Sequence, residues 1–533
     1  MKHGSKQFIN ILFPALIFGS MTGVLTALFV TLYKLSAKYV IEFSEQSYHF
    51  IKTNLWMIPI VLVLLFGIAF VFSFIYKNSP RLRGGGIPSS IAILRGIVPF
   101  NWIKVLFGVL ILSMISFLIG VPLGNEGPSV LIGTALGYGT VHCLAPKHRA
   151  WNKYSMTGGA CSGFAVATGA PVSGILFAIE EAHQRISPMI ITVSAISVLF
   201  ACITAQLLSS LLGVNVSLFP TLQTITLTIK DVWLPLIIGI LVGLFAVLFL
   251  KYYKVVNAFF NKTLNKIPTY LKIFSIFALT LGLGLYSFSC ISTGHELILN
   301  LLDGNGLTAL ITLTLILIVR STLTLSANTN KITGGIFLPI LALGALASSI
   351  IANILIQFLG LNVDYYQIIL ALGITACIAG MMKMPLTAIV FAIEALSCHN
   401  NILYVIVVSA VSFTFTELFH TKSINDSVVD NIIKNNYTQS KTMVYDAFVT
   451  VQKGSFATGK QIRDILWPAN TFILSTTPNT THLTQVDEHG GESLREGDLL
   501  HIRYSTRDSK QTKIELLAIV GEQDFVEKET YEV

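Results

Sequence analysis

Apolar and polar residues are distributed unevenly along this chain, and the pattern predicts its main elements. Long apolar stretches separated by short polar loops fill roughly the first 420 residues. A straight helix needs about 20 apolar residues to cross a hydrocarbon core of about 30 Å. Eight stretches reach or approach that length, at residues 8–33, 56–76, 103–121, 188–213, 233–250, 271–290, 307–326 and 335–359. The pattern predicts an all-α membrane protein with many spans.

The pattern changes near residue 420, where polar residues become dominant and the apolar runs become short. Alternation of apolar and polar residues predicts strands at 443–451, 471–475 and 498–504, and a short helix at 459–466 that ends before Pro468. We therefore expect a transmembrane domain at 1–420, a linker at 421–442 and a small α+β domain at 443–533.

Composition agrees with a membrane protein and indicates its orientation. The hydrophobic fraction is 53% and the charged fraction is 12%, whereas soluble proteins average roughly 25% charged residues. Basic residues lie in short loops beside apolar segments, and Lys2, His3 and Lys6 precede the first one. The positive-inside rule then predicts cytoplasmic termini in a plasma-membrane protein, and the net charge of +8 reflects this orientation rather than nucleic-acid binding.

Other classes of protein find little support in the sequence. The six cysteines form no CxxC pair and none lies in the polar C-terminal part, so a disulfide framework or a metal site is not expected. No nucleophile and base, and no cluster of metal ligands, stand out. We expect no resident cofactor and do not expect an enzyme.

An internal repeat divides the membrane part into two halves. The run APVSGILFAIEEA at 170–182 resembles MPLTAIVFAIEAL at 384–396, with Pro171 aligned to Pro385 at an offset of 214. A second echo pairs the Gly-x-x-x-Pro runs that begin at Gly124 and Gly335, at an offset of 211. Duplicated halves are common in transporters, whose substrate sites lie between the halves. The sequence alone leaves open whether the halves are parallel or inverted.

Three glycine-rich segments interrupt the apolar stretches, at 84–88, 124–128 and 334–339. In each, glycines are followed by proline and then by a helix-forming run, which is typical of a helix start. A helix N-terminus offers unpaired N–H groups and about half a positive elementary charge. Inside a membrane these groups need a partner, and an anion is suitable. Packing glycines and kinks are the alternative, but three such segments favour a shared anion site.

Glu126 lies at the start of the second segment. A carboxylate within a membrane costs several kcal/mol and is usually functional. At a helix N-terminus it would occupy an anion position and leave when protonated, so it is a candidate gate and proton carrier; a fixed helix cap is the alternative. Glu180 has a repeat counterpart in Glu394 and is interpreted as structural, whereas Glu181 has none and is the candidate for proton chemistry.

Two cations, Arg320 and Lys383, fall within apolar segments. They could attract anions or simply lie at helix ends, and we favour helix ends for both.

The three motifs and the FAIEE run, in this order, resemble the CLC family of chloride channels and proton/chloride exchangers. GGGIP is similar to the family's GSGIP, GNEGP to GREGP, and GGIFLP to GxFxP, over about residues 8–432. The resemblance implies inverted halves with tilted and half-length helices, a homodimer in the lipid bilayer with one pore per subunit, and transport of chloride or a related anion together with protons.

The resemblance also implies roles for individual residues. Glu126 corresponds to the external gating glutamate, and Glu181 to the internal proton-transfer glutamate of the exchangers. The expected anion-binding positions are Gly85, Gly86, Ile87, Asn125, Gly127, Ile336, Phe337 and Asn425.

Three positions depart from the family pattern. Gly85 replaces the pore serine, Asn125 replaces the arginine of GREGP, and Asn425 falls where the pore tyrosine is expected. A hydrogen bond to a charged partner contributes roughly 1.5–3 kcal/mol. The loss of two hydroxyl donors therefore leaves anion affinity, selectivity and coupling open, and fluoride stays an alternative to chloride.

The C-terminal domain resembles the TrkA C-terminal (RCK-C) regulatory module through the stretches at 454–465 and 496–500. Modules of this type bind small ligands, cyclic di-AMP among them. This implies a regulatory cyclic dinucleotide; passive dimerisation is the alternative.

We therefore expect membrane transport of a small inorganic anion, with chloride/proton exchange as the first hypothesis. A passive anion channel and a fluoride/proton antiporter are alternatives of the same class. A ligand-sensing membrane receptor with a vestigial pore is the alternative of another class.

Overall fold

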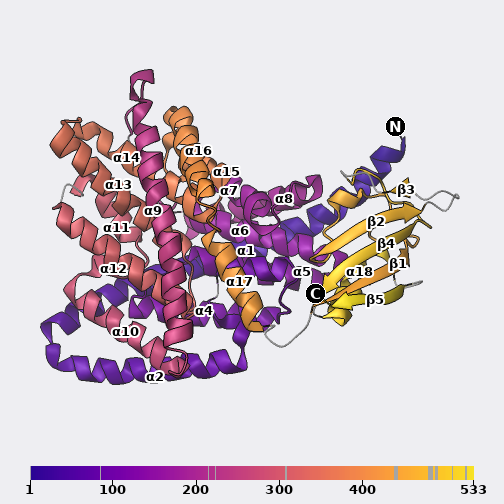
Figure 1. Ribbon diagram of the computed structural model, residues 1–533, viewed down its shortest axis with the longest axis horizontal. Helices are drawn as coiled ribbons and strands as arrows, with labels where there is room; N and C mark the ends of the chain where they lie inside the picture. Colours follow the sequence, from indigo (N-terminus) through magenta and orange to yellow (C-terminus); the bar gives the residue numbers. More distant parts are fainter. Residues whose placement is uncertain are drawn as a thin grey trace.

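The protein is described by a computed structural model (Figure 1). It describes residues 2–84, 86–213, 215, 217–222, 224–305, 309–436, 442–477, 484–485, 490–506, 508–521 and 525–532. Gly85, one of the expected anion-binding positions, lies outside these residues.

The first half of the membrane part contains both long and short helices. Proline stands in the first turn of α3, α7 and α8, where its missing N–H costs nothing. The helices of this half are α1 (Lys2–Thr53), α2 (Ile58–Asn78), α3 (Ile87–Leu94), α4 (Trp102–Ile119), α5 (Glu126–Leu144), α6 (Asn152–Thr168), α7 (Pro171–Phe177) and α8 (Pro188–Leu212).

The second half repeats this alternation of long and short helices. Its helices are α9 (Trp233–Ala258), α10 (Thr269–Tyr286), α11 (His295–Asn300), α12 (Leu310–Thr329), α13 (Phe337–Leu359), α14 (Tyr366–Cys377), α15 (Pro385–Ala395), α16 (Ile402–Leu418) and α17 (Ile424–Asn436). Within the described residues, ten helical segments are long and apolar enough to cross a membrane. The predicted multi-pass membrane architecture is confirmed.

A small α+β domain follows (Figure 1). Its strands are β1 (Met443–Thr450), β2 (Thr471–Thr477), β3 (Thr484–Gln485), β4 (Leu499–Thr506) and β5 (Val526–Glu532), and helix α18 spans Ser509–Val520. The sheet order is β3-β2-β4-β1-β5, and neighbouring strands pair antiparallel over the described residues. Leu516 and Val520 of α18 are buried in one cluster with Leu500, Ile502 and Tyr504 of β4.

The sequence predicted β1, β2 and β4 but not α18 or β5. The predicted helix at 459–466 was wrong, because only a 3₁₀ turn forms there, at Ile462–Asp464. Pairing of Gln461 with Ser493 holds this segment extended before the turn. The expected linker at 421–442 contains helix α17.

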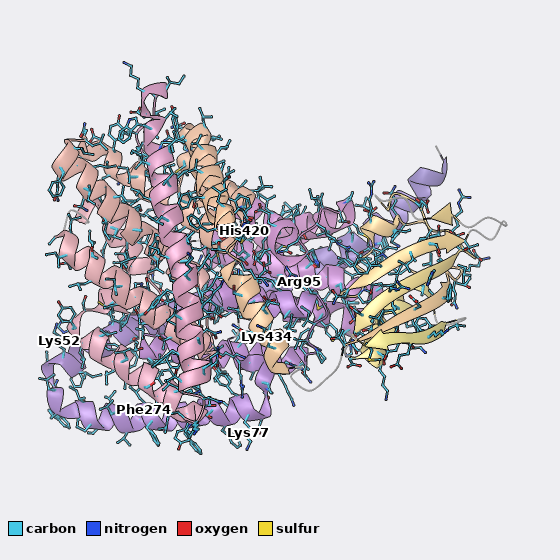
Figure 2. All side chains as sticks on the ribbon, in the orientation of Figure 1. Lys52, Lys77, Arg95, Phe274, His420 and Lys434 are labelled. Carbon is cyan, nitrogen blue, oxygen red and sulfur yellow. The ribbon has the colours of Figure 1, made fainter. Side chains whose placement is uncertain are left out.

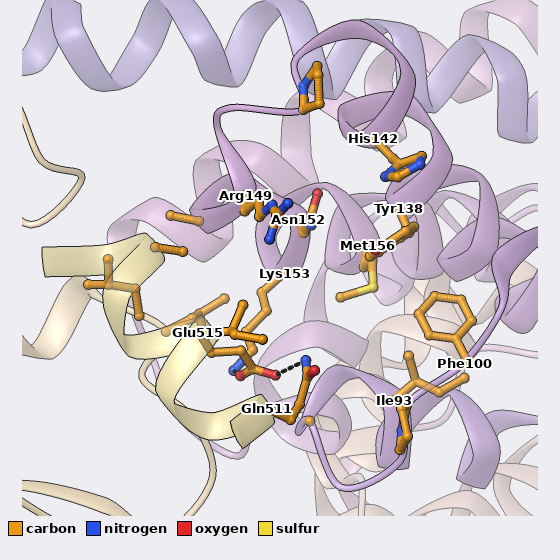
Figure 3. Close-up of a pocket in the computed structure, with 18 of the residues that line it drawn as sticks. Ile93, Phe100, Tyr138, His142, Arg149, Asn152, Lys153, Met156, Gln511 and Glu515 are labelled. Carbon is orange, nitrogen blue, oxygen red and sulfur yellow. Dashed lines mark hydrogen bonds and ion pairs between the residues drawn. The ribbon is translucent and has the colours of Figure 1, made fainter. Parts of the chain in front are cut away.

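The α+β domain contacts the membrane domain directly. The Tyr154 hydroxyl donates to Asp464 O at 2.7 Å and accepts from Leu466 N at 2.9 Å. Lys153 Nζ lies 2.8 Å from Glu515 Oε2. Figure 3 shows this boundary, where a cavity of about 420 Å³ lies between α18 and the membrane domain.

Candidate functional site

The glycine-rich segments of the two halves meet in the interior. Gly124 N donates to Gly335 O at 2.6 Å, and Gly335 N donates to Gly124 O at 2.8 Å. The third segment joins them, since Gly84 N donates to Lys331 O at 2.8 Å and Gly334 N donates to Gly84 O at 3.4 Å. The structure thus brings together the three segments that the sequence singled out.

Only glycine allows this close approach of backbones. A Cβ atom on Gly127 would lie 2.5 Å from Gly335 Cα and 3.1 Å from Gly86 Cα. These distances are shorter than ordinary carbon–carbon contact of about 3.5–4.0 Å. The glycines therefore permit three helix starts to share one place.

Helices α3, α5 and α13 all begin beside this meeting point, at Ile87, Glu126 and Phe337. Their first N–H groups have no partner within their own helix. In Figure 1, α5 lies on the side towards the sheet and α13 on the opposite side. Helix starts that converge from different directions can stabilise a small anion with partial positive charges.

Glu126 lies at the centre of this arrangement as the first residue of α5. Its side chain is fully buried, and neither carboxylate oxygen has a hydrogen-bond partner of ordinary geometry among the described residues. The amide of Leu338, the ammonium group of Lys34 and the imidazole of His295 interact with it electrostatically. A Cβ on Gly124 would meet its oxygen Oε2, so the carboxylate turns back over its own glycine loop.

Four phenylalanine rings, Phe337 among them, form a buried cluster. Phe337 packs edge-on against Phe164 at 5.0 Å and against Phe391 at 5.6 Å, and Phe164 stacks on Phe177 at 5.6 Å. Phe177 and Phe391 are counterparts in the internal repeat. The sequence motifs alone did not indicate a role for these aromatic rings, although the repeated FAIE run places a phenylalanine at the same position in both halves. They form a buried apolar cluster beside the start of α13.

Glu181 and Asn425 form a second buried polar group. Glu181 is 3% exposed and Asn425 is fully buried. The Asn425 amide interacts with the Glu181 carboxylate, but it makes no hydrogen bond of ordinary geometry within the described part of the chain. The position expected to hold a hydroxyl donor therefore holds an amide group beside Glu181.

Glu180 and Glu394 bind the first turns of opposite helices. Glu180 accepts hydrogen bonds from Leu386 N at 2.8 Å and Thr387 N at 2.7 Å, at the start of α15. Glu394 accepts from Val172 N at 2.8 Å and Ser173 N at 3.0 Å, at the start of α7. Each residue thus caps a helix of the other half. This reciprocal capping agrees with an approximate two-fold relation between the two halves.

The interpretation of the isolated cations is corrected in part. Arg320 lies in the middle of α12 and is fully buried, so the prediction of a helix end was wrong. It donates to Ser289 O, Ile291 O and Ser292 O at 3.0, 2.6 and 2.8 Å, and so fixes the loop before α11. Lys383 does lie at a helix end, 2.7 Å from Glu417 Oε1.

Fold and site together define a polytopic membrane protein of two related halves whose helix starts enclose a buried carboxylate. The chain belongs to the voltage gated chloride channel family, whose model matches residues 67–417. The resemblance seen in the sequence is thereby confirmed for the membrane domain, whereas the TrkA-C resemblance stays a prediction.

Known proteins similar to this chain include several transporters. The H(+)/Cl(-) exchange transporter ClcA of Vibrio vulnificus is 28% identical over 451 residues, which cover 82% of this chain and 92% of that protein. ClcA of Vibrio parahaemolyticus is 27% identical over 436 residues, 80% of this chain and 91% of that protein. A slow cyanobacterial Cl−/H+ antiporter has a similar fold, with a TM-score of 0.70 at 24% identity over 79% of this chain and 98% of its own. A CLC-type fluoride/proton antiporter gives a TM-score of 0.64 at 17% identity, over 76% and 96%.

Proposed function

We propose that this protein exchanges chloride for protons across the plasma membrane. The observation that carries the proposal is Glu126, a fully buried carboxylate without fixed partners where three helix starts meet. An ionised carboxylate and a chloride ion compete for the same partial positive charges. Protonation removes the charge of Glu126, releases the carboxyl group and opens the anion position, so anion movement and proton movement are linked.

The anion is held by backbone rather than by full charges. The expected contacts are the amides near Gly86, Ile87, Ile336 and Phe337, with Gly127 allowing close approach and Asn125 at the start of α5. Partial charges bind an ion weakly enough to release it. On the cytoplasmic side, Asn425 supplies an amide N–H where a hydroxyl is missing.

Glu181 completes the proposed proton route from the cytoplasm. It is buried yet lies only two residues before His183, at the end of the helical segment near the cytoplasmic domain. A second carboxylate, separate from the anion site, lets a proton reach Glu126 without following the anion. A channel needs no such group, so Glu181 favours exchange over passive conduction.

We propose a homodimer in which the surface around Glu180 and Glu394 is covered by a second copy. Glu180 and Glu394 are half-buried on their helix faces, and the amides of Val172 and Leu386 that they bind belong to exposed residues. Charged groups facing lipid are costly. A second copy related by a two-fold axis would cover this face with the same face and remove that cost.

Both termini are proposed to be cytoplasmic. The basic loop at 147–153 contacts the α+β domain through Lys153 and Glu515, and the N-terminal end of α1 lies on the same side of the molecule (Figure 1). Positive charges concentrated on one side indicate the cytoplasm. The domain at 443–533 is proposed to regulate transport by binding a small ligand, for which the boundary cavity of about 420 Å³ has a suitable size.

Reconstitution in liposomes tests the proposal. Purified protein is given an outward gradient of chloride, fluoride, nitrate or bicarbonate, and proton movement is recorded with anion flux. The proposal predicts that a chloride gradient drives protons uphill. Chloride flux without proton movement would instead support a channel, a fluoride preference would support the fluoride antiporter, and the absence of any flux would support a receptor.

A further inference from the structure

The helix that carries Glu181 ends differently from its counterpart in the other half. In the first half, α7 passes into a π-helical turn at Ala178–Ala182. In the second half, the same FAIE run stays α-helical to Ala395, the counterpart of Glu181. Local π-helical turns are often found at functional sites. The difference in helix type between the two halves therefore lies at Glu181, which has no acidic counterpart in the second half.

The π-turn separates the directions of two adjacent carboxylates. Glu180 faces α15, where it binds Leu386 and Thr387. Glu181 instead faces inward and is 3% exposed, beside Asn425. The geometry of the turn thus decides whether Glu181 reaches the interior.

Arg95 holds the end of this turn. Its Nε donates to Ala182 O at 3.0 Å and its Nη2 donates to Glu181 O at 2.9 Å. Its Nη1 lies 3.5 Å from Asp426 Oδ1, next to Asn425. Figure 2 shows Arg95 between the helices of the membrane domain and the sheet. A single planar guanidinium therefore links Glu181 and the start of α17.

Arg95 also connects this turn with the anion site. It directly follows α3, whose first turn begins at Gly86 and Ile87 in the meeting point of the helix starts. The carbonyls of Glu181 and Ala182, which Arg95 binds, lie at the end of their helical segment. The last carbonyls of a helix have no partner within that helix and interact favourably with a cation. The fork of an arginine can satisfy two of them at once, which a lysine cannot.

The residues after the turn are held by both domains. Arg185 Nη2 donates to Ile465 O of the α+β domain at 2.9 Å, whereas His183 Nε2 lies 2.8 Å from Thr157 Oγ1 of α6. Gly96, next to Arg95, faces the carboxylate of Glu515, with about 3.5 Å between an added Cβ and Oε2. The turn is thus fixed from the membrane side by Arg95 and from the cytoplasmic side by the loop before β2.

We propose that Arg95 is a positioning residue for internal proton transfer, holding the π-turn so that Glu181 faces Asn425. The inference rests on the proposed role of Glu181. Arg95 binds main-chain oxygens rather than the carboxylate, so its removal changes the direction of Glu181 and leaves the anion site of α5 and α13 intact.

The test measures proton and chloride flux separately in liposomes for Arg95→Gln, Arg95→Lys and the control Lys147→Gln. Lys147 is an exposed cation in the loop before α6 and does not line the boundary cavity. We expect Arg95→Gln to lower proton flux about tenfold, roughly the factor of one charge-assisted hydrogen bond, with chloride flux within about twofold of wild type. Arg95→Lys keeps one bond and should be intermediate, and Lys147→Gln should match wild type.

A double variant separates positioning from general damage. In the Glu181→Gln background, Arg95→Gln should cause no further loss of proton flux, because its effect passes through Glu181. Equal losses of both fluxes in the two Arg95 variants, or no loss in either, would overturn the inference. If Glu181→Gln itself leaves proton flux unchanged, the proposed role of Glu181 fails instead, which distinguishes the two failures.

Discussion

Glu180 and Glu394 cap each other's helices across the two halves of the membrane domain. Glu180 binds the first turn of α15, the helix that carries Glu394, and Glu394 binds the first turn of α7, from whose end Glu180 projects. Each carboxylate receives two amide N–H bonds and one hydroxyl bond. The pair therefore fixes the two half-length helices to each other and is structural.

Replacing either cap should lower stability. We expect Glu180→Ala or Glu394→Ala to cost about 2 kcal/mol, since the first-turn amides of α15 or α7 lose their capping acceptor. Thermal unfolding in detergent, followed by size-exclusion chromatography, measures the loss. The exposed Glu42→Ala is the control and should change little. Unchanged melting of both cap variants would contradict the structural role.

The glycine meeting point should not tolerate a side chain. Gly127→Ala puts a Cβ 2.5 Å from Gly335 Cα, and overpacking of this kind costs about 1–3 kcal/mol. We expect lower stability and loss of chloride flux. Gly67→Ala is a matched control, because a Cβ there meets nothing within 4 Å, and it should be neutral or slightly stabilising. Full activity of Gly127→Ala would contradict the proposed site.

Tyr154 should hold the α+β domain against the membrane domain. Tyr154→Phe removes a hydroxyl that bonds both Asp464 O and Leu466 N, at a cost of about 1–3 kcal/mol. Hydrogen–deuterium exchange should increase across residues 456–467 but not in β1 and β4. Tyr39→Phe, at an exposed position, should leave exchange unchanged. Equal protection in wild type and Tyr154→Phe would show that this contact does not hold the domain.

Glu181 should be needed for protons but not for anions. Glu181→Gln keeps the shape of the side chain and removes its titration. In liposomes we expect proton flux to fall to background while chloride flux continues. Stability should stay near that of wild type, in contrast to the Glu180 variant, because Glu181 caps no helix. Loss of both fluxes would place Glu181 in the anion pathway instead.

The sequence predicted the features that depend on local patterns. The motif at 124–128 and its repeat at 335–339 predicted the helix starts, because glycine and proline influence where a membrane helix can begin. The structure added their convergence, through the bridge between Gly124 and Gly335. The alternation of strands β1, β2 and β4 was likewise visible in the local pattern.

Features that depend on contacts between distant segments could not be predicted. Glu180 binds amides 206 and 207 residues away, and no local pattern indicates that partner. Arg320 was misinterpreted because its three carbonyl acceptors belong to a loop 28–31 residues earlier. The π-turn at Glu181 could not be predicted either, since the run FAIE predicts the same helix in both halves.

The central claim is that Glu126 links anion and proton movement, and Glu126→Gln tests it most directly. Wild-type protein in liposomes should move protons uphill when a chloride gradient is applied. The account predicts that Glu126→Gln, which mimics the protonated carboxyl group, keeps chloride flux and shows no proton movement. Proton transport by Glu126→Gln that stays coupled to chloride would contradict the account.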